Sequence, residues 1–210
     1  MSSNILPEAD VLKFHLNYPA GNAKYFSGFM AGLRDARRVT GRDESTGAAA
    51  NTNLRGSWLG AVGYMSMLDQ IGKCFRPKGK TSGNTNRAIC EALKAFTALQ
   101  DDAILALYAL RCSFTHDFCL FNWNANDARL QHHFLVTSGG NQLVTLPVSP
   151  WDGNYPANGT SITIIDLGLL GDLVETIYKD ICAHVQAGTL DIILPDGSDE
   201  LLNRYANYKA

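Results

Sequence analysis

LALYALRCSFTHDFCLFNWN, residues 105–124, is the stretch that decides the fold, because a helical apolar pattern ends within it and a β-rich pattern follows it. Polar and ionisable side chains stand inside this apolar run, with Arg111 and His116 at its centre. Arginine is a permanent cation with a planar donor fork, whereas the imidazole of histidine titrates near neutral pH. Together the two side chains suit phosphate chemistry.

The chain upstream of this stretch has the spacing of amphipathic helices, with hydrophobic residues three and four positions apart. A further helix begins at Asp101 and Asp102, whose carboxylates favour the positive end of a helix dipole. Residues 1–22 lack the pattern and predict an extended or irregular lead-in, and residues 42–51 predict an exposed, mobile loop. The expected helices cover residues 23–39, 53–75 and 85–99 and the segment that carries Arg111.

Helix geometry sets a condition on the two central residues. A regular helix turns by about 100° per residue, so Arg111 and His116, five residues apart, would point about 140° away from each other. The helix must therefore bend, tighten or end within residues 113–115 if both side chains are to enter one cleft.

Glycines and cysteines favour packing over chemistry. Gly56, Gly60 and Gly63 leave one stripe of a helix without side chains, which predicts the close approach of another helix. The spacing is not the GxGxxG fingerprint of a dinucleotide site. The five cysteines are odd in number and lie in apolar patterns, which predicts reduced, buried thiols.

Beyond residue 124 the apolar period changes to that of strands. Residues 130–137 and 143–148 flank Ser138-Gly139-Gly140-Asn141 and predict a β-hairpin, and residues 161–165 predict a third strand. We expect these strands to form a β-rich insertion, residues 127–165, within a single domain that spans residues 1–210.

Helical spacing then returns over residues 166–186 and stops before Gly188, a residue type that commonly ends helices. A short strand is expected at residues 190–194. The last helix is expected to begin at Ser198 or Asp199.

Charge is divided unequally along the chain. Residues 1–111 contain 14 Lys and Arg against 9 Asp and Glu, or +5, whereas residues 112–210 contain 4 against 11, or −7. A nucleic acid would therefore be expected on the first half. There, the basic turn RPKGKTSGN at residues 76–84 makes Arg76 and Lys78 candidate contacts to a phosphate backbone, with simple solvation as the alternative.

Neither a cofactor nor a membrane is indicated. Cys112, His116 and Cys119 have spacings that a zinc site could use, but no fourth ligand is evident, so we expect no metal. The first residues lack the pattern of a secretory signal, and no run of about eighteen apolar residues occurs. We therefore expect a cytoplasmic protein.

The segment Arg111-Cys112-Ser113-Phe114-Thr115-His116 resembles the Arg-x4-6-His motif of the HEPN superfamily, here with an interval of four residues. The order of expected elements over residues 23–186 is also similar to that family's: a long helix pair, a helix that carries the motif toward its end, and another long helix. Members commonly have a polar residue directly after the arginine, where this chain has Cys112. The resemblance implies a mainly α fold, a helical bundle often built as a homodimer, with the β-rich insertion after the motif-bearing helix.

The resemblance also implies a chemistry. His116 would transfer protons and Arg111 would bind the scissile phosphate, without a metal. Tyr108 and Phe118 would stack unpaired bases, and Asp117 would also lie at the substrate. The chain would then be a metal-independent endoribonuclease that leaves 2′,3′-cyclic phosphate ends, in a toxin or defence role, with RNA as substrate and a protein antitoxin as partner.

Other interpretations stay open. Arg111 is equally explained as a cation at the negative end of a helix dipole, paired with Asp117, and His116 as a cap of exposed carbonyl groups. The chain would then be a non-catalytic helical dimerisation module or an RNA- or protein-binding module. His116-Asp117 also resembles part of the HD phosphohydrolase motif, but the only histidine upstream, His15, is far away in the sequence.

Overall fold

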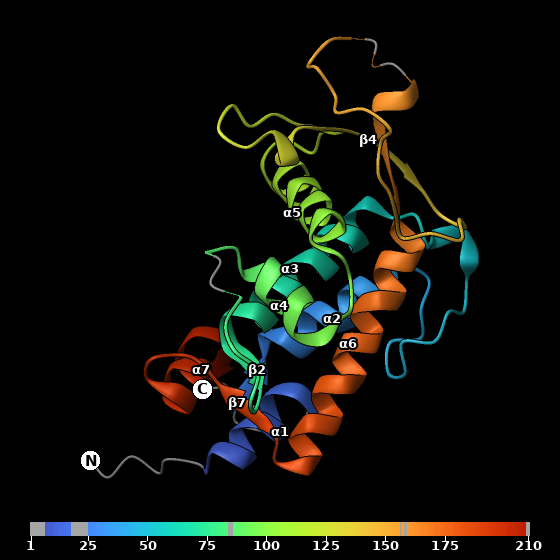
Figure 1. Ribbon diagram of the computed structural model, residues 1–210. Coiled ribbons are helices and arrows are strands. Elements are labelled where there is room, and N and C mark those ends of the chain that lie inside the picture. The colour runs from blue at the N-terminus through green and yellow to red at the C-terminus, as the bar shows by residue number, and fades with distance from the viewer. Residues whose placement is uncertain (1–6, 18–24, 84–85, 156, 158, 209–210) are drawn as a thin grey trace.

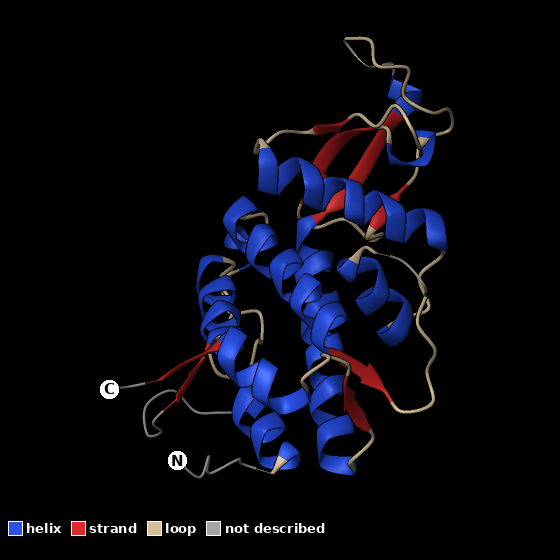
Figure 2. Ribbon diagram, turned by 90° about the vertical axis from the view of Figure 1, so that its left-hand side faces the viewer, coloured by secondary structure: helices blue, strands red, loops and turns tan. Residues whose placement is uncertain are grey.

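The computed structural model describes residues 7–17, 25–83, 86–155, 157 and 159–208. Helices form the body of this part of the chain, and a four-stranded sheet lies at one end of it (Figures 1 and 2). The predicted predominance of helix is confirmed. The α-helices are α1 (Glu8–Asn17), α2 (Gly28–Val39), α3 (Trp58–Cys74), α4 (Ala88–Phe96), α5 (Asp101–His116), α6 (Leu167–Ala187) and α7 (Gly197–Tyr205). The strands are β1 (Tyr25–Ser27), β2 (Phe75–Pro77), β3 (Phe121–Asn122), β4 (His132–Thr137), β5 (Val144–Thr145), β6 (Ile162–Asp166), β7 (Leu190–Ile192) and β8 (Ala206–Tyr208).

Helix α3 is the centre of the helical body and contacts α2, α4, α5 and α6. Its side chains Tyr64, Met65, Leu68 and Ile71 are fully buried. Burial of a large apolar side chain stabilises a fold by about 1.5–3 kcal/mol. The core of the protein therefore lies around α3.

Glycines allow α2 to approach α3 closely. A Cβ atom at Gly60 would collide with the side chain of Thr40, and a Cβ atom at Gly63 would lie 3.1 Å from Cβ of Ala36. The predicted close approach is confirmed at these two positions. Gly56 precedes the helix and takes no part in the contact with α2.

The predicted β-hairpin is wrong in its pairing. Strands β4 and β5 lie in one sheet, but β6 lies between them, in the order β3-β4-β6-β5. Strand β6 pairs parallel with β4 and antiparallel with β5. Its residues Thr163 and Ile165 are fully buried, so burial favours β6 at the centre of the sheet. The backbone N–H groups of Gly139 and Gly140 donate to Asp166 Oδ2 at 2.7 and 2.6 Å.

Two short antiparallel pairs join segments that are far apart in the sequence: β1 with β8, and β2 with β7. Strand β7 confirms the strand expected at residues 190–194. Arg76, expected in a basic turn, lies instead in β2 opposite Asp191. A strand of three residues is too short to show the alternation of apolar and polar side chains by which longer strands are predicted from a sequence.

The expected irregular lead-in is also wrong in part. Residues 8–17 of the expected lead-in form α1, in which Val11 and Leu16 are buried; residues 1–6 and 18–22 of that lead-in lie outside the described residues. The loop at residues 42–51 is irregular and mostly exposed, as expected, except at Arg42 and Gly47, which are buried. The first long helix begins at Gly28, after β1, and not at residue 23.

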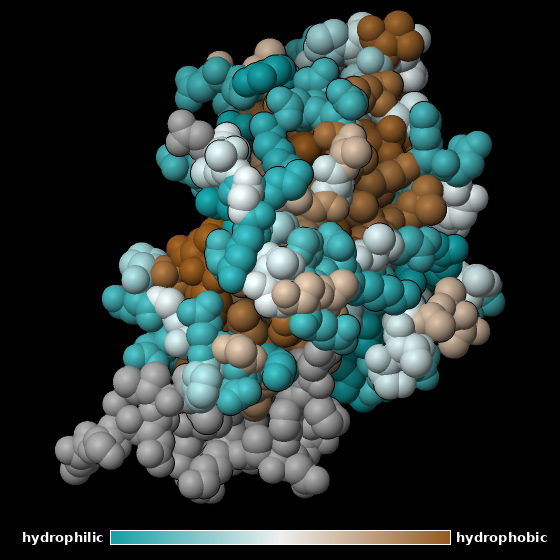
Figure 3. Space-filling view, turned by 60° about the horizontal axis from the view of Figure 1, so that its bottom comes forward, coloured by the Kyte–Doolittle hydropathy of each residue, from teal (hydrophilic) through white to brown (hydrophobic). Residues whose placement is uncertain are grey.

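Viewed from the α1 end, the surface is largely hydrophilic, and hydrophobic residues gather in separate patches (Figure 3). No helix within the described ranges is long and apolar enough to cross a membrane. The exposed large hydrophobic residues include Leu59, Phe118, Phe121, Trp123, Val148 and Tyr155.

Candidate functional site

Arg111 is held by an acidic residue of the central helix. Its Nε and Nη2 atoms both lie 2.7 Å from Oδ2 of Asp69, so α5 and α3 are joined by this ion pair. The arginine side chain is 28% exposed and the aspartate side chain 16%. Burial acts to lower the pKa of Arg111, but the hydrogen bond and charge of Asp69 outweigh it and raise that pKa. The side chain is therefore fixed in position, charged, and partly exposed to solvent.

Further polar groups surround this pair. Tyr108 lies one turn before Arg111, and the guanidinium of Arg87 stands 4.8 Å from the centre of its ring. Burial and a hydrogen bond to Cys112 raise the pKa of Tyr108. The polar residue that the HEPN motif commonly has after its arginine is thus replaced by a thiol that interacts with Tyr108.

His116 does not join Arg111 within one chain. Helix α5 runs without a break to His116, and the N–H of Asp117 donates to Ser113 O at 3.2 Å. The bend or end that one shared cleft would require within residues 113–115 is absent from this helix. The two side chains consequently point about 140° apart and are separated by about 7.5 Å along the helix axis. His116 is exposed at the end of the helix.

The other predicted site residues are dispersed. Asp117 is exposed, and Arg111 pairs with Asp69 instead of with it. Arg76 lies 3.5 Å from Glu91. Lys78 is exposed after β2. Within the described residues, no hydrogen bond or ion pair links Arg76 or Lys78 to Arg111.

Three aromatic rings gather beside the end of α5. Trp58 and Phe114 stack with ring centres 4.9 Å apart, and Phe118 lies 5.9 Å from Trp58 and 6.0 Å from Phe114. Phe118 has φ 52°, and it is the only non-glycine residue with a positive φ in the described part of the chain. That conformation costs roughly 1–2 kcal/mol for an L-residue. The sequence predicted a role for Phe118 but not its contact with Trp58.

A second aromatic cluster lies on the sheet side of the molecule and was not predicted. The His133 ring is 5.6 Å from Trp151 and 5.7 Å from Tyr155, and Trp123 meets Trp151 edge-on at 6.0 Å. Among the described residues, the buried Nδ1 atom of His133 has no hydrogen-bond partner. No periodic signal identifies this cluster, because its members lie in a short strand and in turns.

A third cluster is closed to solvent. Arg37 donates from Nε and Nη2 to the two carboxylate oxygens of Glu175 at 2.8 and 2.7 Å, and Tyr64 donates to the same carboxylate at 3.0 Å. Beside this cluster, Arg42, in the loop after α2, pairs at 2.7 Å with Asp172, whose side chain is 43% exposed. The contacts of Arg37 and Tyr64 with Glu175 join α2 and α3 to α6. Because the Arg37 and Glu175 side chains are only 2% and 5% exposed, the pair serves packing and not a ligand.

The described residues contain no group of three His, Cys, Asp or Glu side chains placed to hold a metal ion. No protein-family model, no curated protein and no solved structure matches the chain. The HEPN resemblance therefore rests on the motif and on the order of the helices alone.

Proposed function

We propose that the chain is a HEPN-like, RNA-directed protein that acts as a metal-independent endoribonuclease. The observation that carries the proposal is the state of Arg111: an acid of the neighbouring helix fixes it, yet 28% of its side chain is exposed. Partial exposure lowers the cost of removing this charge from water, and it also leaves the side chain accessible to an anion. A cation that binds a phosphate needs both the fixed geometry and the opening.

The chemistry follows from the two groups. His116 removes the proton of a ribose 2′-hydroxyl, and the 2′-oxygen attacks the adjacent phosphorus. The bond from phosphorus to the 5′-oxygen breaks, and that oxygen takes up a proton. Arg111 binds the phosphate oxygens on which negative charge accumulates. The products are a 2′,3′-cyclic phosphate and a 5′-hydroxyl.

A second copy of the chain completes the proposed site. Because α5 is continuous, Arg111 and His116 of one chain diverge and cannot bind the same phosphate. In a symmetric dimer, Arg111 of one copy and His116 of the other can face one phosphate, and the symmetry then produces two such sites. The proposed enzyme is accordingly a homodimer.

The test is cleavage of a labelled single-stranded RNA in EDTA by the wild type, His116→Ala and Arg111→Ala. Loss of a general acid–base group is expected to slow cleavage by about 10²–10⁴-fold. His184→Ala is the matched control, since His184 is another partly exposed histidine near a helix end. Dependence on metal, or equal rates for wild type and His116→Ala, would contradict the proposal.

Mixing the two inactive variants tests the shared site. In a mixed dimer of His116→Ala and Arg111→Ala, one site keeps both functional groups and the other loses both. Random exchange of subunits is therefore expected to restore about a quarter of wild-type activity. No recovery, with subunit exchange verified, would exclude a site shared between chains.

The second candidate function is RNA binding without cleavage. It is favoured by the divergence of Arg111 and His116 along the continuous helix α5, because a single chain then has no proton-transfer group beside its arginine. RNA binding that weakens with salt, together with no cleavage by wild type, would select this function.

A further inference from the structure

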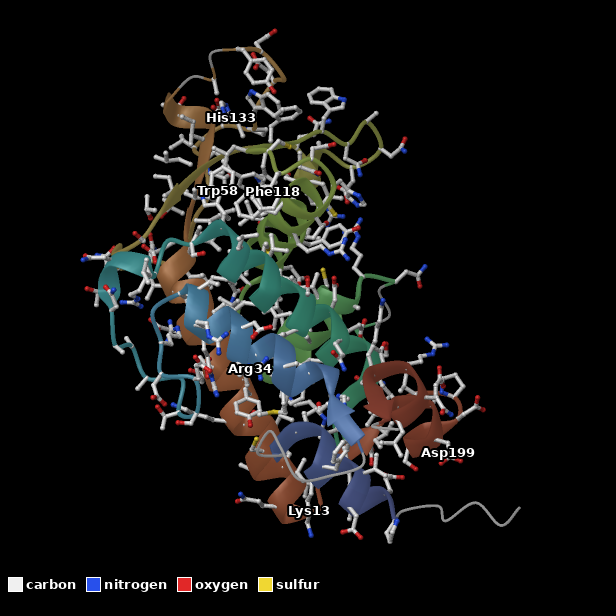
Figure 4. The ribbon with its side chains drawn as sticks, turned by 180° about the vertical axis from the view of Figure 1, so that it is seen from behind. Lys13, Arg34, Trp58, Phe118, His133 and Asp199 are labelled. Carbon is white, nitrogen blue, oxygen red and sulfur yellow. The ribbon has the colours of Figure 1, made fainter. Side chains whose placement is uncertain are left out.

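We propose that Trp58 and Phe118 form a subsite on which one unstacked nucleobase of single-stranded RNA lies, beside His116. This inference rests on the proposed function and names how its substrate is held. Figure 4 shows the two rings next to each other, where the start of α3 meets the end of α5, with His133 in a separate group nearer the tip. The rings and the proposed proton-transfer group thus belong to the same end of the molecule.

The ring planes have the geometry of a stacking platform. The planes of Trp58 and Phe114 differ by 20°, and those of Phe114 and Phe118 by 10°. Phe114 is 1% exposed and anchors the group in the core, whereas Phe118 is 48% exposed. Aromatic rings prefer such offset, near-parallel contacts, and a nucleobase adds to them in the same way.

The backbone holds Phe118 at the end of the helix at a cost. The N–H groups of Asp117 and Cys119 both donate to Ser113 O, at 3.2 and 3.3 Å, and this closes α5 with Phe118 in the left-handed region. Glycine is the residue that suits this position. The backbone at this helix end favours glycine over phenylalanine. The presence of phenylalanine therefore points to a role for its ring.

The position of the subsite favours a base over a phosphate. His116 is two residues before Phe118, and the exposed carboxylate of Asp117 lies between them in the sequence. That negative charge opposes a phosphate over the ring but does not oppose a neutral base. The adjoining Leu59 is 66% exposed and extends the apolar surface beside Trp58. Arg111 and His116 then bind the phosphate, and the rings of Trp58 and Phe118 bind the base.

The experiment measures binding of a fluorescent 2′-O-methyl RNA oligonucleotide, which cannot be cleaved because its 2′-oxygen is blocked. Phe118→Gly is expected to weaken binding by about 5- to 100-fold, which corresponds to the loss of one base stacked on an aromatic ring. Phe118→Gly suits the backbone at this position, and its midpoint in urea should equal or exceed that of wild type. Phe118→Leu keeps the apolar bulk and should also weaken binding, and Phe121→Leu, which changes an exposed ring of the other cluster, should not.

An abasic oligonucleotide with the same phosphates separates stacking from charge. It should bind wild type and Phe118→Gly equally. Equal binding of the 2′-O-methyl RNA by wild type, Phe118→Gly and Phe118→Leu would overturn the inference. A loss of equal size for the abasic strand, accompanied by a change from dimer to monomer in light scattering, would also overturn it and assign the patch to contact between copies.

These outcomes are independent of cleavage. Phe118→Gly should weaken binding of the 2′-O-methyl RNA even if no RNA is ever cut. Cleavage of RNA by wild type and by Phe118→Gly with the same KM would leave the proposed function standing and remove the subsite.

Discussion

Two pairs of arginine and carboxylate join helices in this molecule, and they differ in their access to solvent. Arg37 and Glu175 connect α2 with α6 and are 2% and 5% exposed, whereas Arg111 and Asp69 connect α5 with α3 and are 28% and 16% exposed. In the first pair both carboxylate oxygens are used, and in the second pair one oxygen receives both nitrogen atoms. The same two functional groups thus produce one closed and one open pair.

This difference in solvent exposure distinguishes an ion pair that only joins helices from one that could also bind a ligand. A charge removed from water must be compensated, and Glu175 does this for Arg37 with help from Tyr64. Asp69 compensates Arg111 in the same way, but both of these side chains remain partly exposed to solvent. An anion can therefore approach Arg111 but not Arg37. Substitutions in the closed pair and in the open pair test this difference.

The largest expected effect is on the closed pair. Glu175→Gln should lower the free energy of unfolding by about 3–5 kcal/mol, because it leaves the buried guanidinium of Arg37 without a counter-charge. Asp69→Asn, the matched change in the open pair, should cost about 1 kcal/mol or less. Urea denaturation at pH 7 measures both. Equal losses in the two variants would remove the distinction between the pairs.

A decrease in pH should also lower the stability of the fold, mainly through buried groups. His15 is fully buried, within hydrogen-bond distance of Gln70, and burial lowers its pKa from 6.5 to about 4. Between these two pH values the unfolded chain gains a proton that the folded chain does not, so stability should fall by about 3 kcal/mol in total as pH decreases. Above pH 6.5 and below pH 4 this group should contribute no further change.

Unfolding free energies measured from pH 7.5 to pH 4 check this dependence, and His15→Gln is the control that should flatten it. Burial lowers the pKa of His132 as well, and that residue adds a change in the same direction. An unchanged slope in His15→Gln would show that His15 does not set the acid limit of the fold.

A smaller effect than those of Glu175→Gln and His15 concerns the contact of α2 with α3. Gly60→Ala should destabilise the fold by about 1–3 kcal/mol, because its Cβ atom would meet Thr40. Gly32→Ala is the control within α2, where a Cβ atom meets nothing within 4 Å, and it should stabilise by about 0.5–1 kcal/mol. Thermal unfolding measures both the loss of stability expected for Gly60→Ala and the gain expected for Gly32→Ala. A neutral Gly60→Ala would show that α2 is free to shift.

Helices were the part of the fold that the sequence could predict. The spacing within residues 53–75 and 166–186 identifies α3 and α6 because a long helix repeats its apolar stripe several times, and Gly188, with φ 66°, ends α6 as expected. Helix α1 has a weaker pattern and was missed.

Pairings between distant segments were not predictable in the same way. Residues 130–137 and 143–148 are close in sequence and separated by a turn, which favoured a hairpin, but the buried residues of β6 compete for the same edge and occupy it. Such competition depends on burial in three dimensions. A single sequence shows only which neighbours are near along the chain.

The candidate site shows the same limit. Arg111 and His116 were identified by their position in an apolar run, but the partner of Arg111 was not, since Asp69 lies 42 positions earlier in another helix. The sequence did contain one indication of this partner, because Asp69 is an acidic residue among apolar neighbours in α3. The stack of Trp58 on Phe118 had no sign at all, because it depends on one left-handed residue.

Asp166 accepts hydrogen bonds from the turn at Gly139 and Gly140 through one oxygen and from Leu169 N through the other, where it caps α6. One carboxylate therefore couples the position of a surface turn to the start of a long rigid helix. Twelve residues further on, about 18 Å along the helix, Tyr178 of α6 donates to Leu16 O of α1. Helix α6 therefore has its first residues held at the turn of the sheet and its Tyr178 held at α1.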